Sequence, residues 1–562
     1  MKISQLTADL SVSSQVSIDD IDRAAADGFA MIINNRPDQE EPGQPTSMAL
    51  QARAESHGMA YRHIPVVPGQ ISDASTAAFA AALTAATGPV LAFCRTGTRS
   101  THLWALSQVG ILSSGEITDA AKAAGYDIAD LRPRLASGSS GVASGSVHDV
   151  VIVGGGSAGL ATAASLLKRD RSLDIVVIEP SADHYYQPGW TMVGGGVFAA
   201  ASTCRPEAKV MPDGVTWVKA AVAAFDPAND AVTLADGTSI AYRVLVVAPG
   251  NILDWGAIDG LEATLSRNGV TSNYSYATAP YTWDLVRTLR EGIALFTQPP
   301  MPIKCAGAPQ KAMYLSCDHW RRQGVLGDID VAFHTAGAVL FGVKDYVPAL
   351  MTYVERYGID LAFESTLVAV DGDAKTATFR EKAGEVTRPF DMIHVTPPQK
   401  APAFVADSAL ANAAGYVDVD QVTMRHTRYA NIFGLGDAGS MPNAKTMAAA
   451  RKQAPIVAEN VIATLTGKEP VAIYDGYGSC PLTVERGKIV LAEFGYGGTL
   501  LPSFPTWLID GTQPRRLSWL LKSEALPWIY WNGMLKGHEW MAHPAHRQPA
   551  PPAAPPAATT AA

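Results

Sequence analysis

Several features that would assign this chain to a specialised class are missing from its sequence. Five cysteines among 562 residues are too few and too scattered for a disulfide framework, which favours a reducing compartment. Acidic residues outnumber basic ones, 53 against 44, and the formal net charge of −9 argues against nucleic acid as a partner. No run of about 18 uncharged apolar residues occurs, so we expect no membrane-spanning helix.

Targeting and metal-binding patterns are also missing. The first residues, MKISQLTADLSVSS, have no basic segment leading into an apolar run, so we expect no signal peptide. No cysteines and histidines have metal-ligand spacing, and we predict no metal site. The chain does have 47% hydrophobic and 17% charged residues, over a length too great for one core. This composition indicates about two to four globular domains.

Stretches of small polar residues and of proline divide the chain. Residues 136–148 include ASGSSGVASGSV, which is typical of a flexible linker, and residues 548–562 are a Pro/Ala-rich stretch that we predict to be a disordered tail. We therefore predict a first domain over 1–135, a larger domain over 149–510 and a C-terminal segment over 511–547. Strands alternate with helices in both domains, so the predicted fold class is α/β with parallel sheets.

The first domain contains a cysteine at the end of a strand. The strands and helices that we expect there cover 18–26, 29–35, 75–86 and 89–94. The last strand ends at Cys94, and a helix is expected directly after it. Backbone N–H groups at such a position stabilise a thiolate, as do nearby Arg95 and Arg99, and Gly97 allows the loop to curl.

The loop Cys94-Arg95-Thr96-Gly97-Thr98-Arg99 resembles the active-site loop of rhodanese sulfurtransferases. It also resembles that of protein-tyrosine-phosphatase-like domains of the beta-lactamase-hydrolase-like family, a resemblance that covers most of residues 1–130. A tyrosine phosphatase needs its arginine six positions after the cysteine, where Ser100 stands. The shorter loop favours a persulfide, which implies that Cys94 carries sulfane sulfur and that Arg99 and the loop amides hold its charge. Phosphatase activity stays open.

A dinucleotide-binding fingerprint opens the second domain. The residues Gly154-Gly155-Gly156-Ser157-Ala158-Gly159 follow the strand DVVIV and begin a helix, and Glu179 ends the next strand. In this pattern the glycines form a tight turn that accepts a pyrophosphate, and the acidic residue binds ribose hydroxyls. The predicted cofactor-binding residues are Gly154, Gly156, Ser157, Ala158, Gly159 and Glu179.

Two further segments favour FAD as the cofactor. The short strand in YANIFGLGDAG ends at Gly436-Asp437, which resembles the second FAD fingerprint of two-dinucleotide-domain flavoproteins, whose aspartate binds the ribitol. Residues 242–250 resemble another strand of those proteins. A nicotinamide donor would require a second glycine fingerprint after residues 293–299, but a proline-rich turn with Cys305 stands there. We therefore predict bound FAD that receives electrons through a thiol.

Four segments resemble sulfide:quinone oxidoreductases, in the subgroup that includes the mitochondrial enzyme. They are HYYQPGWTMVGGG, PIKCAGAPQKAMYLS, HVTPP and YDGYGSCPL, and the resemblance covers most of residues 148–541. It implies oxidation of sulfide to sulfane sulfur by a cysteine pair beside FAD, with electrons passed to a membrane quinone. Cys305 matches the flavin-proximal cysteine of that pair. Its partner should follow Asp437, but Ala438 stands there.

The missing partner leaves alternatives open. Cys480 matches a family position without a redox role and is expected to be structural, Cys317 is expected in the core, and Cys204 is undecided. Sulfur could pass from Cys305 to Cys94, which the linker holds at a high effective concentration, or to a soluble thiol or persulfide acceptor. The flavin half could instead have lost sulfide oxidation and act as a scaffold or on another sulfur species. A third alternative joins a phosphatase to a flavin reductase.

The C-terminal segment, 511–547, suggests contact with a membrane. It carries five basic against two acidic residues and four of the 11 tryptophans of the chain, in apolar runs too short to span a bilayer. This pattern is typical of an interfacial anchor, although a helical pair packed on the body is an alternative. We predict a cytoplasmic enzyme held peripherally on the inner face of the cell membrane. The oligomeric state stays open, a homo-oligomer included.

Overall fold

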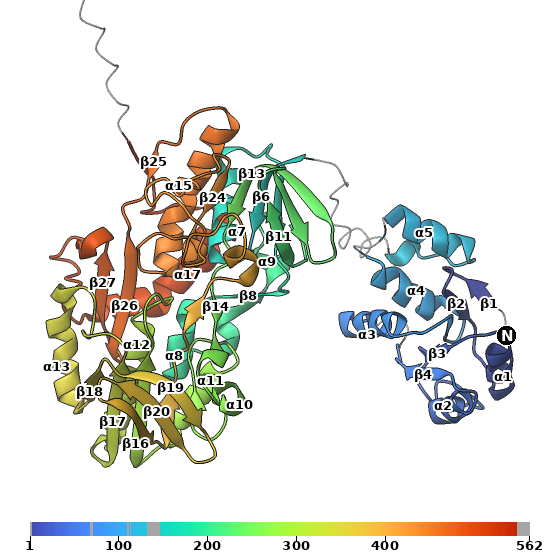
Figure 1. Ribbon diagram of the computed structural model, residues 1–562, viewed down its shortest axis with the longest axis horizontal. Coiled ribbons are helices and arrows are strands. Elements are labelled where there is room, and N and C mark those ends of the chain that lie inside the picture. The colour runs from blue at the N-terminus through green and yellow to red at the C-terminus, as the bar shows by residue number, and fades with distance from the viewer. Residues whose placement is uncertain (1–2, 68–70, 110–111, 113, 132–146, 548–562) are drawn as a thin grey trace, which may run out of the picture. The chain divides into compact units, whose positions relative to one another are not determined.

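The computed structural model describes residues 3–67, 71–109, 112, 114–131 and 147–547 (Figure 1), and the chain divides into two compact units, Met1–Val142 and Ala143–Ala562. Most of the predicted linker, 136–148, lies outside the described residues, although its last two residues begin a strand. The predicted tail, 548–562, lies wholly outside them.

The first unit is built on one sheet with the strand order β1-β2-β5-β3-β4. β1 is antiparallel to β2, and the other neighbouring strands are parallel. The strands are β1 (Ile3–Gln5), β2 (Leu10–Ser13), β3 (Met31–Asn34), β4 (Ala60–His63) and β5 (Val90–Phe93). The helices are α1 (Ile18–Ala26), α2 (Ser47–Ser56), α3 (Asp73–Thr84), α4 (Thr98–Ser107) and α5 (Ser114–Ala123).

Helices cover both faces of this sheet. Along β5, Val90 and Ala92 join the core cluster that includes residues of α3 and α4, whereas Leu91 and Phe93 join the cluster that includes residues of α1 and α2. Successive strand side chains point to opposite faces, so a strand buried on both sides is a continuous apolar run. The predicted strands and helices of the first domain are confirmed.

The second unit contains a parallel sheet in the order β10-β7-β6-β13, with β24 also paired to β13 and with antiparallel β12 and β11 continuing beyond it. The strands are β6 (Val147–Val153), β7 (Ile175–Ile178), β10 (Val215–Val218), β11 (Val222–Asp226), β12 (Ala231–Leu234), β13 (Ser239–Val247) and β24 (Ile432–Gly434). In Figure 1, helices α7 (Ser157–Arg169) and α15 (Met447–Leu465) lie beside this sheet, and they pack on each other.

A second parallel sheet has the order β15-β22-β16-β17-β18. Its strands are β15 (Val270–Thr271), β16 (Gly292–Gln298), β17 (Ile329–Thr335), β18 (Asp360–Phe363) and β22 (Met392–His394). Strands β19 (Thr366–Asp371), β20 (Thr376–Glu381) and β21 (Gly384–Pro389) form an antiparallel sheet. Other helices of the unit include α8 (Trp190–Gly194), α11 (Ala279–Thr288) and α13 (Val347–Tyr357).

The helix α12 (Ala308–Gln323) connects β16 to β17 and packs on the hairpin of β26 (Gly478–Glu485) and β27 (Lys488–Phe494). Its ends are marked in the sequence. Pro309 occupies the first turn, where its missing N–H costs nothing, and Gly324 ends the helix with a φ of 76°. This packing brings the loop before α12 against the hairpin, although about 170 residues separate them in sequence.

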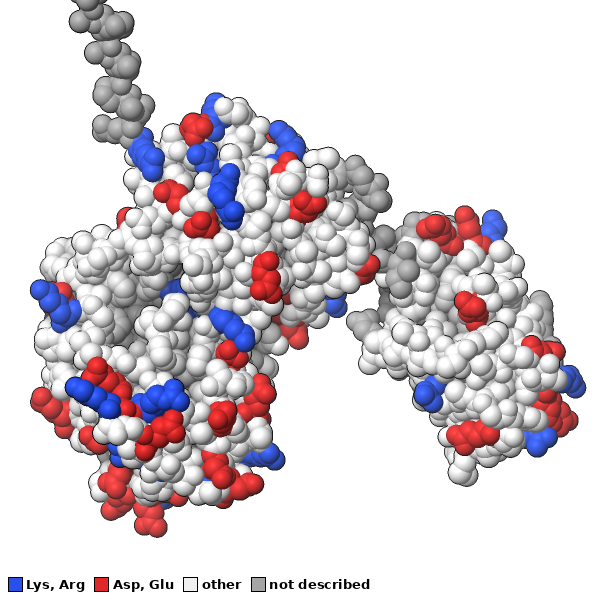
Figure 2. All heavy atoms as spheres, viewed as in Figure 1, with Lys and Arg blue, Asp and Glu red and all other residues white. Residues whose placement is uncertain are grey.

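The C-terminal segment packs against α7. It consists of α16 (Arg516–Leu520), a π-helical turn (Leu521–Ala525), α17 (Leu526–Asn532) and a 3-10 turn (Met534–Lys536), with Trp531 and Leu535 buried. Among the described residues no helix combines the length and apolar character needed to cross a bilayer. Figure 2 shows acidic and basic side chains interspersed over the visible face of this unit.

Candidate active site

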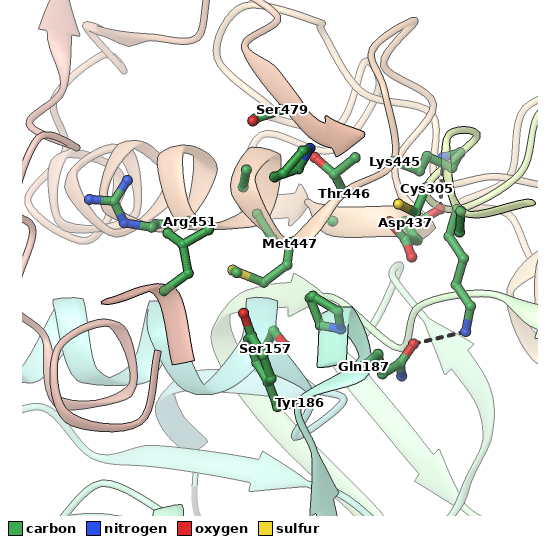
Figure 3. Close-up of a pocket in the computed structure, with 18 of the residues that line it drawn as sticks. Ser157, Tyr186, Gln187, Cys305, Asp437, Lys445, Thr446, Met447, Arg451 and Ser479 are labelled. Carbon is green, nitrogen blue, oxygen red and sulfur yellow. Dashed lines mark hydrogen bonds between the residues drawn. The ribbon is translucent and has the colours of Figure 1, made fainter. Parts of the chain in front are cut away.

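A pocket in the second unit lies where several strands of the first parallel sheet end. Its wall includes the turns after β6, β13 and β24, the loop of Cys305 and the start of α15. Figure 3 shows Cys305 beside Asp437 and Lys445 at one end of the pocket, with Ser157 and Tyr186 on another wall. The turns come from the carboxyl ends of parallel strands, which is where ligands bind in open α/β sheets.

The glycine turn before α7 has the geometry of a pyrophosphate site. Gly154 has a φ of 103°, and a Cβ there would lie 2.5 Å from the carbonyl oxygen of Ala248. A Cβ on Gly159 would lie 1.9 Å from the carbonyl oxygen of Gly154. Gly156, in contrast, faces open space, and no side chain caps the helix that it precedes. The first N–H groups of α7 therefore point into the pocket beside a position with no side chain.

Two carboxylates lie near the pocket, Glu179 beside this glycine turn and Asp437 in the turn that follows β24. Glu179 follows β7 and accepts hydrogen bonds from the backbone N–H groups of Gly155 and Ser181, each at 2.8 Å. Asp437 lines the pocket, and burial raises its pKa, although Lys445 and Lys304 oppose the shift. The open helix start, the carboxylate that ends β7 and the buried aspartate fit the pyrophosphate, ribose and ribitol of FAD, respectively.

Cys305 lies on the loop between β16 and α12, in an unusual backbone conformation. Its φ of 50° is in the left-handed region, which residues other than glycine seldom occupy. Its N–H donates to the carbonyl oxygen of Lys445 at 2.7 Å, and its own carbonyl accepts from Ala308 N–H at 2.7 Å and Tyr274 Oη at 3.2 Å. Backbone held in such a conformation is typical of functional sites.

The thiol of Cys305 is surrounded by groups that favour its ionised form. Cys480 Sγ lies 3.9 Å from Cys305 Sγ, and Lys311 Nζ donates to Cys305 Sγ at 3.0 Å. The hydrogen bond with Cys480, followed by the charge and hydrogen bond of Lys311, holds the pKa of Cys305 well below its ordinary value, although burial opposes the shift. The contact with Cys305 and burial raise the pKa of Cys480 well above its ordinary value. Of the two thiols, Cys305 is therefore the one that ionises more readily.

Two buried lysines, Lys311 and Lys522, lie close to this thiol, and sequence reasoning missed Lys522. Burial by itself would lower the pKa of Lys311, but the charges of the two cysteines raise it, so the ammonium persists. Lys522 comes from the π-helical turn of the C-terminal segment, lines the same pocket and donates to the carbonyl oxygen of Pro188 at 3.2 Å. Burial and the charge of Lys311 lower its pKa to about 7. The one signal in the sequence is a lysine within the apolar run RLSWLLK.

The same C-terminal segment is hydrogen-bonded to the start of α7. Tyr530 Oη lies 2.7 Å from Ser157 Oγ and 2.5 Å from His184 Nε2, and His184 Nδ1 lies 3.0 Å from Glu207 Oε2. Farther along the segment, Glu539 accepts hydrogen bonds from side chains of α7, namely Ser165, Lys168 and Arg169. His184 thus joins the C-terminal segment to the body of the unit.

The other cysteines of this unit have different surroundings. Cys317 is fully buried within α12, where burial raises its pKa far above its ordinary value, as expected for a core residue. Cys204 lies on a short strand, Cys204–Pro206, and burial and the charge of Asp183 raise its pKa. Ala438 is buried in a 3-10 turn and offers no thiol. Within the described ranges no three His, Cys, Asp or Glu side chains gather as a metal site would require.

The first unit places Cys94 directly after β5 and before α4. Its side chain is fully buried, and the Gly97 N–H donates to Cys94 Sγ at 3.2 Å. Gly97 has a φ of 89°, and a Cβ there would lie 2.0 Å from the hydroxyl of Tyr126. The expected contact between the thiol and a loop amide is therefore present.

The arginines of this loop have carboxylate partners. Arg99 donates to Glu40 Oε2 at 2.9 Å and to the carbonyl oxygen of Val66 at 2.7 Å. Arg95 lies 2.9 Å from Glu41 Oε1. The hydrogen bond from Arg99 lowers the pKa of Glu40 more than burial raises it. The guanidinium of Arg99 is thus neutralised within the fold.

The glycine turn, the buried aspartate and the reactive thiol define the second unit as a flavoprotein of the disulphide-oxidoreductase type. A family model described as pyridine nucleotide-disulphide oxidoreductase matches residues 148–289. The mitochondrial sulfide:quinone oxidoreductase of Dictyostelium discoideum is 42% identical over 394 residues, covering 70% of this chain and 86% of that protein. The chain therefore belongs to the sulfide:quinone oxidoreductase family, and its cofactor is FAD, as predicted.

A solved structure agrees with this fold. The sulfide:quinone oxidoreductase from Aquifex aeolicus aligns with a TM-score of 0.58 at 20% identity, covering 69% of this chain and 92% of that one. The first unit matches a different family, described as beta-lactamase hydrolase-like protein, phosphatase-like domain, over residues 2–111. A beta-lactamase hydrolase-like protein of Xylella fastidiosa is 39% identical over 130 residues, which is 23% of this chain and 30% of that protein. The predicted resemblances to the beta-lactamase-hydrolase-like family and to sulfide:quinone oxidoreductases are confirmed.

Proposed function

We propose that this chain uses FAD to oxidise sulfide to sulfane sulfur and passes the electrons to a quinone. The observation that carries the proposal is the Cys305 sulfur, which accepts a hydrogen bond from Lys311 at the pocket that contains the glycine turn and Asp437. A scaffold that had lost its chemistry would have no need to keep a strained cysteine beside a buried ammonium. This site therefore favours an enzyme over the scaffold alternative.

The pocket residues would have separate roles in binding FAD and in controlling the protonation of the thiol. The N–H groups that follow Gly156 would bind the pyrophosphate, Glu179 a ribose and Asp437 the ribitol. When bound, FAD supplies a two-electron acceptor for the thiol chemistry. Lys311 keeps Cys305 ionised, and an ionised sulfur is the reactive form. Lys522, whose pKa is about 7, can hold or release a proton beside the same thiol at neutral pH.

The first unit would receive the product. Cys94 at the end of β5 has the amide contact that a persulfide anion needs, so we assign it as a sulfur acceptor, with a soluble thiol as the alternative acceptor. Its arginine, Arg99, stands one position too early for a tyrosine phosphatase. Release of phosphate from an aryl phosphate would support the phosphatase alternative instead.

Peripheral attachment to a membrane would bring the pocket to its quinone. The supporting observation is a set of large exposed apolar side chains in and just before the C-terminal segment, with Trp507 84%, Trp528 57% and Leu520 55% exposed. Exposed tryptophans beside cations are typical of interfacial binding. Replacing Trp507 and Trp528 by Ala should reduce co-sedimentation with anionic vesicles, and unchanged binding would contradict the attachment.

Anaerobic spectroscopy tests the central proposal. Sulfide added to the purified protein should bleach the flavin absorbance, and a short-chain quinone should restore it. NADH alone should leave the spectrum unchanged. A flavin that does not respond to sulfide would overturn the proposal, and rapid bleaching by NADH would assign the protein to a nicotinamide-dependent class.

A further inference from the structure

We propose that Cys480 is the redox partner of Cys305 and forms with it the disulfide that sulfide attacks. This inference rests on the proposed sulfide oxidation and names the second thiol of its site. The carrying observation is the separation of 3.9 Å between the two sulfur atoms. Ala438 occupies the position where the family resemblance implies the partner cysteine, and alanine has no thiol.

The surroundings of Cys480 are built for a sulfur contact. A Cβ on Gly307, at the start of α12, would lie 3.2 Å from Cys480 Sγ and 2.6 Å from Leu482 Cδ2. Glycine at this position therefore leaves room for the two sulfurs to approach. Forming a disulfide requires them to move about 2 Å closer, since its S–S bond is about 2.05 Å long. Cys305 lies on a loop, which can supply that movement more easily than strand β26, which carries Cys480.

The described surroundings of the other two thiols of this unit exclude them from this role. Cys317 is enclosed within α12, and Cys204 has Tyr185 and Asp183 as neighbours on the strand pair β8 (Asp183–Tyr185) and β9 (Cys204–Pro206). Among the described cysteines of the second unit, Cys480 alone has its sulfur in contact with that of Cys305.

The sulfur chemistry balances with these residues. Hydrosulfide attacks the pocket-lining sulfur of the disulfide, Cys305, and the S–S bond to Cys480 breaks. The proton of the hydrosulfide passes to Cys480, leaving a Cys305 persulfide anion and a Cys480 thiol. An acceptor thiol then takes the terminal sulfur and gives its proton to that sulfur, which leaves a Cys305 thiolate. Loss of two electrons and the Cys480 proton restores the disulfide, with the electrons going to the quinone of the proposed reaction.

Lys311 fits both charged species of this sequence. Its ammonium, 3.0 Å from Cys305 Sγ, can stabilise the persulfide anion and, after sulfur transfer, the thiolate. The two unbonded sulfurs in the structure, 3.9 Å apart, correspond to the reduced pair at the end of the sequence. Only 2% of the surface of Cys480 is exposed. Burial therefore protects its thiol from side reactions with solutes until the pair is reoxidised.

Mass spectrometry of the holoenzyme tests the pairing without an activity measurement. After oxidation with a short-chain quinone, alkylation should miss both Cys305 and Cys480, and proteolysis should release the two peptides joined. Sulfide should then place one extra sulfur on Cys305 and make Cys480 alkylatable after unfolding. Recovery of both cysteines fully alkylated from the quinone-oxidised protein would overturn the proposal.

Substitution separates failure of this inference from failure of the proposed function. The Cys480→Ser variant should lose the joined peptide and the sulfide-driven bleaching of its flavin, while the matched Cys204→Ser variant keeps both. Bleaching of Cys480→Ser at the rate of the unchanged protein would refute the inference and leave sulfide oxidation standing. If the unchanged protein itself does not bleach, the proposed function fails instead. Because the cross-link is measured on the unchanged chain, a Cys480→Ser variant that fails to fold does not affect that test.

Discussion

Each unit of this chain has a cysteine that directly follows a strand or lies on the loop after one. The two cysteines differ in the groups to which the neighbouring positive charges are bound. Beside Cys94, the arginines are paired with carboxylates, Arg99 with Glu40 and Arg95 with Glu41. Beside Cys305, Lys311 donates to the sulfur itself. Among the described residues neither Lys311 nor Lys522 forms an ion pair with a carboxylate.

This difference shows why a cation near a cysteine in sequence does not establish a reactive thiol. A cation neutralised by Glu40 contributes mainly to the fold, because its charge is already compensated. A buried cation whose partner is sulfur stabilises the thiolate directly. We therefore expect Cys305 to receive sulfide and Cys94 to act later, on sulfur that is already oxidised.

Removing each thiol in turn should give the largest contrast. Cys305→Ser should slow sulfide-dependent flavin reduction by at least about a thousandfold, because it deletes the sulfur that sulfide attacks. Cys94→Ser should reduce the flavin at the unchanged rate and lose only the sulfane sulfur bound to the first unit. Stopped-flow absorbance and mass spectrometry of both variants would measure this. Equal losses of flavin reduction would show that the two sites act as one.

The next effect concerns the charge at Cys305. Lys311→Met removes a cause of the lowered pKa of Cys305, so the pKa rises and the thiolate forms at higher pH. Each unit of pKa increase costs about tenfold in thiolate fraction at a pH below both values. The pH dependence of Cys305 alkylation by iodoacetamide should therefore shift to higher pH, and Lys311→Arg, which keeps the charge, should shift less. An unshifted profile would mean that Cys480 alone sets the ionisation.

The glycines of the two anion-binding turns offer a matched pair of smaller changes. Gly97→Ala introduces a Cβ at positive φ against Tyr126 and should destabilise the first unit by about 1–3 kcal/mol. Gly156→Ala enters open space at a negative φ, so the protein should fold normally but retain less FAD. Hydrogen exchange and the flavin-to-protein absorbance ratio report the two outcomes. Normal FAD content in Gly156→Ala would argue against a pyrophosphate at this turn.

Arg99 should affect the stability of the first unit alone. Arg99→Ala removes charged hydrogen bonds to Glu40 and Val66, which should cost the first unit about 1.5–3 kcal/mol without changing the rate of flavin reduction. Amide exchange of β5 and α4 in the full chain measures the loss of stability. If stability is unchanged while Cys94 no longer accumulates sulfane sulfur, Arg99 acts on the sulfur rather than on the fold.

The sequence predicted the parts of the site that belong to short local motifs, and it missed the contacts between residues that only packing brings together. The glycine turn, Glu179 and Asp437 were identifiable because each follows a strand at a defined spacing. Cys305 was identifiable through its motif. Its contact with Cys480 was not, since 175 residues separate them and only the packing of α12 on β26 brings them together. Cys480 was therefore expected to be structural, on family resemblance alone.

The C-terminal segment shows the same limit. Its tryptophans predicted an interface, and its composition could not distinguish a membrane anchor from a helical pair packed on the body. The structure shows packing on α7 together with exposed tryptophans. Lys522 of this segment lines the pocket, and it lies in the π-helical turn at Leu521–Ala525. This turn departs from α-helical periodicity, so the spacing of residues in the sequence did not predict it.

The hydrogen bond between Tyr530 and Ser157 has a practical consequence for dissecting this protein. A chain cut before the C-terminal segment would lose Lys522 from the thiol pocket and the tyrosine that steadies the nucleotide-binding helix, both at once. Such a deletion would impair chemistry even in a detergent solution free of lipid. Lipid attachment and turnover can be separated only by changing outward-facing side chains while the inward-facing ones stay in place.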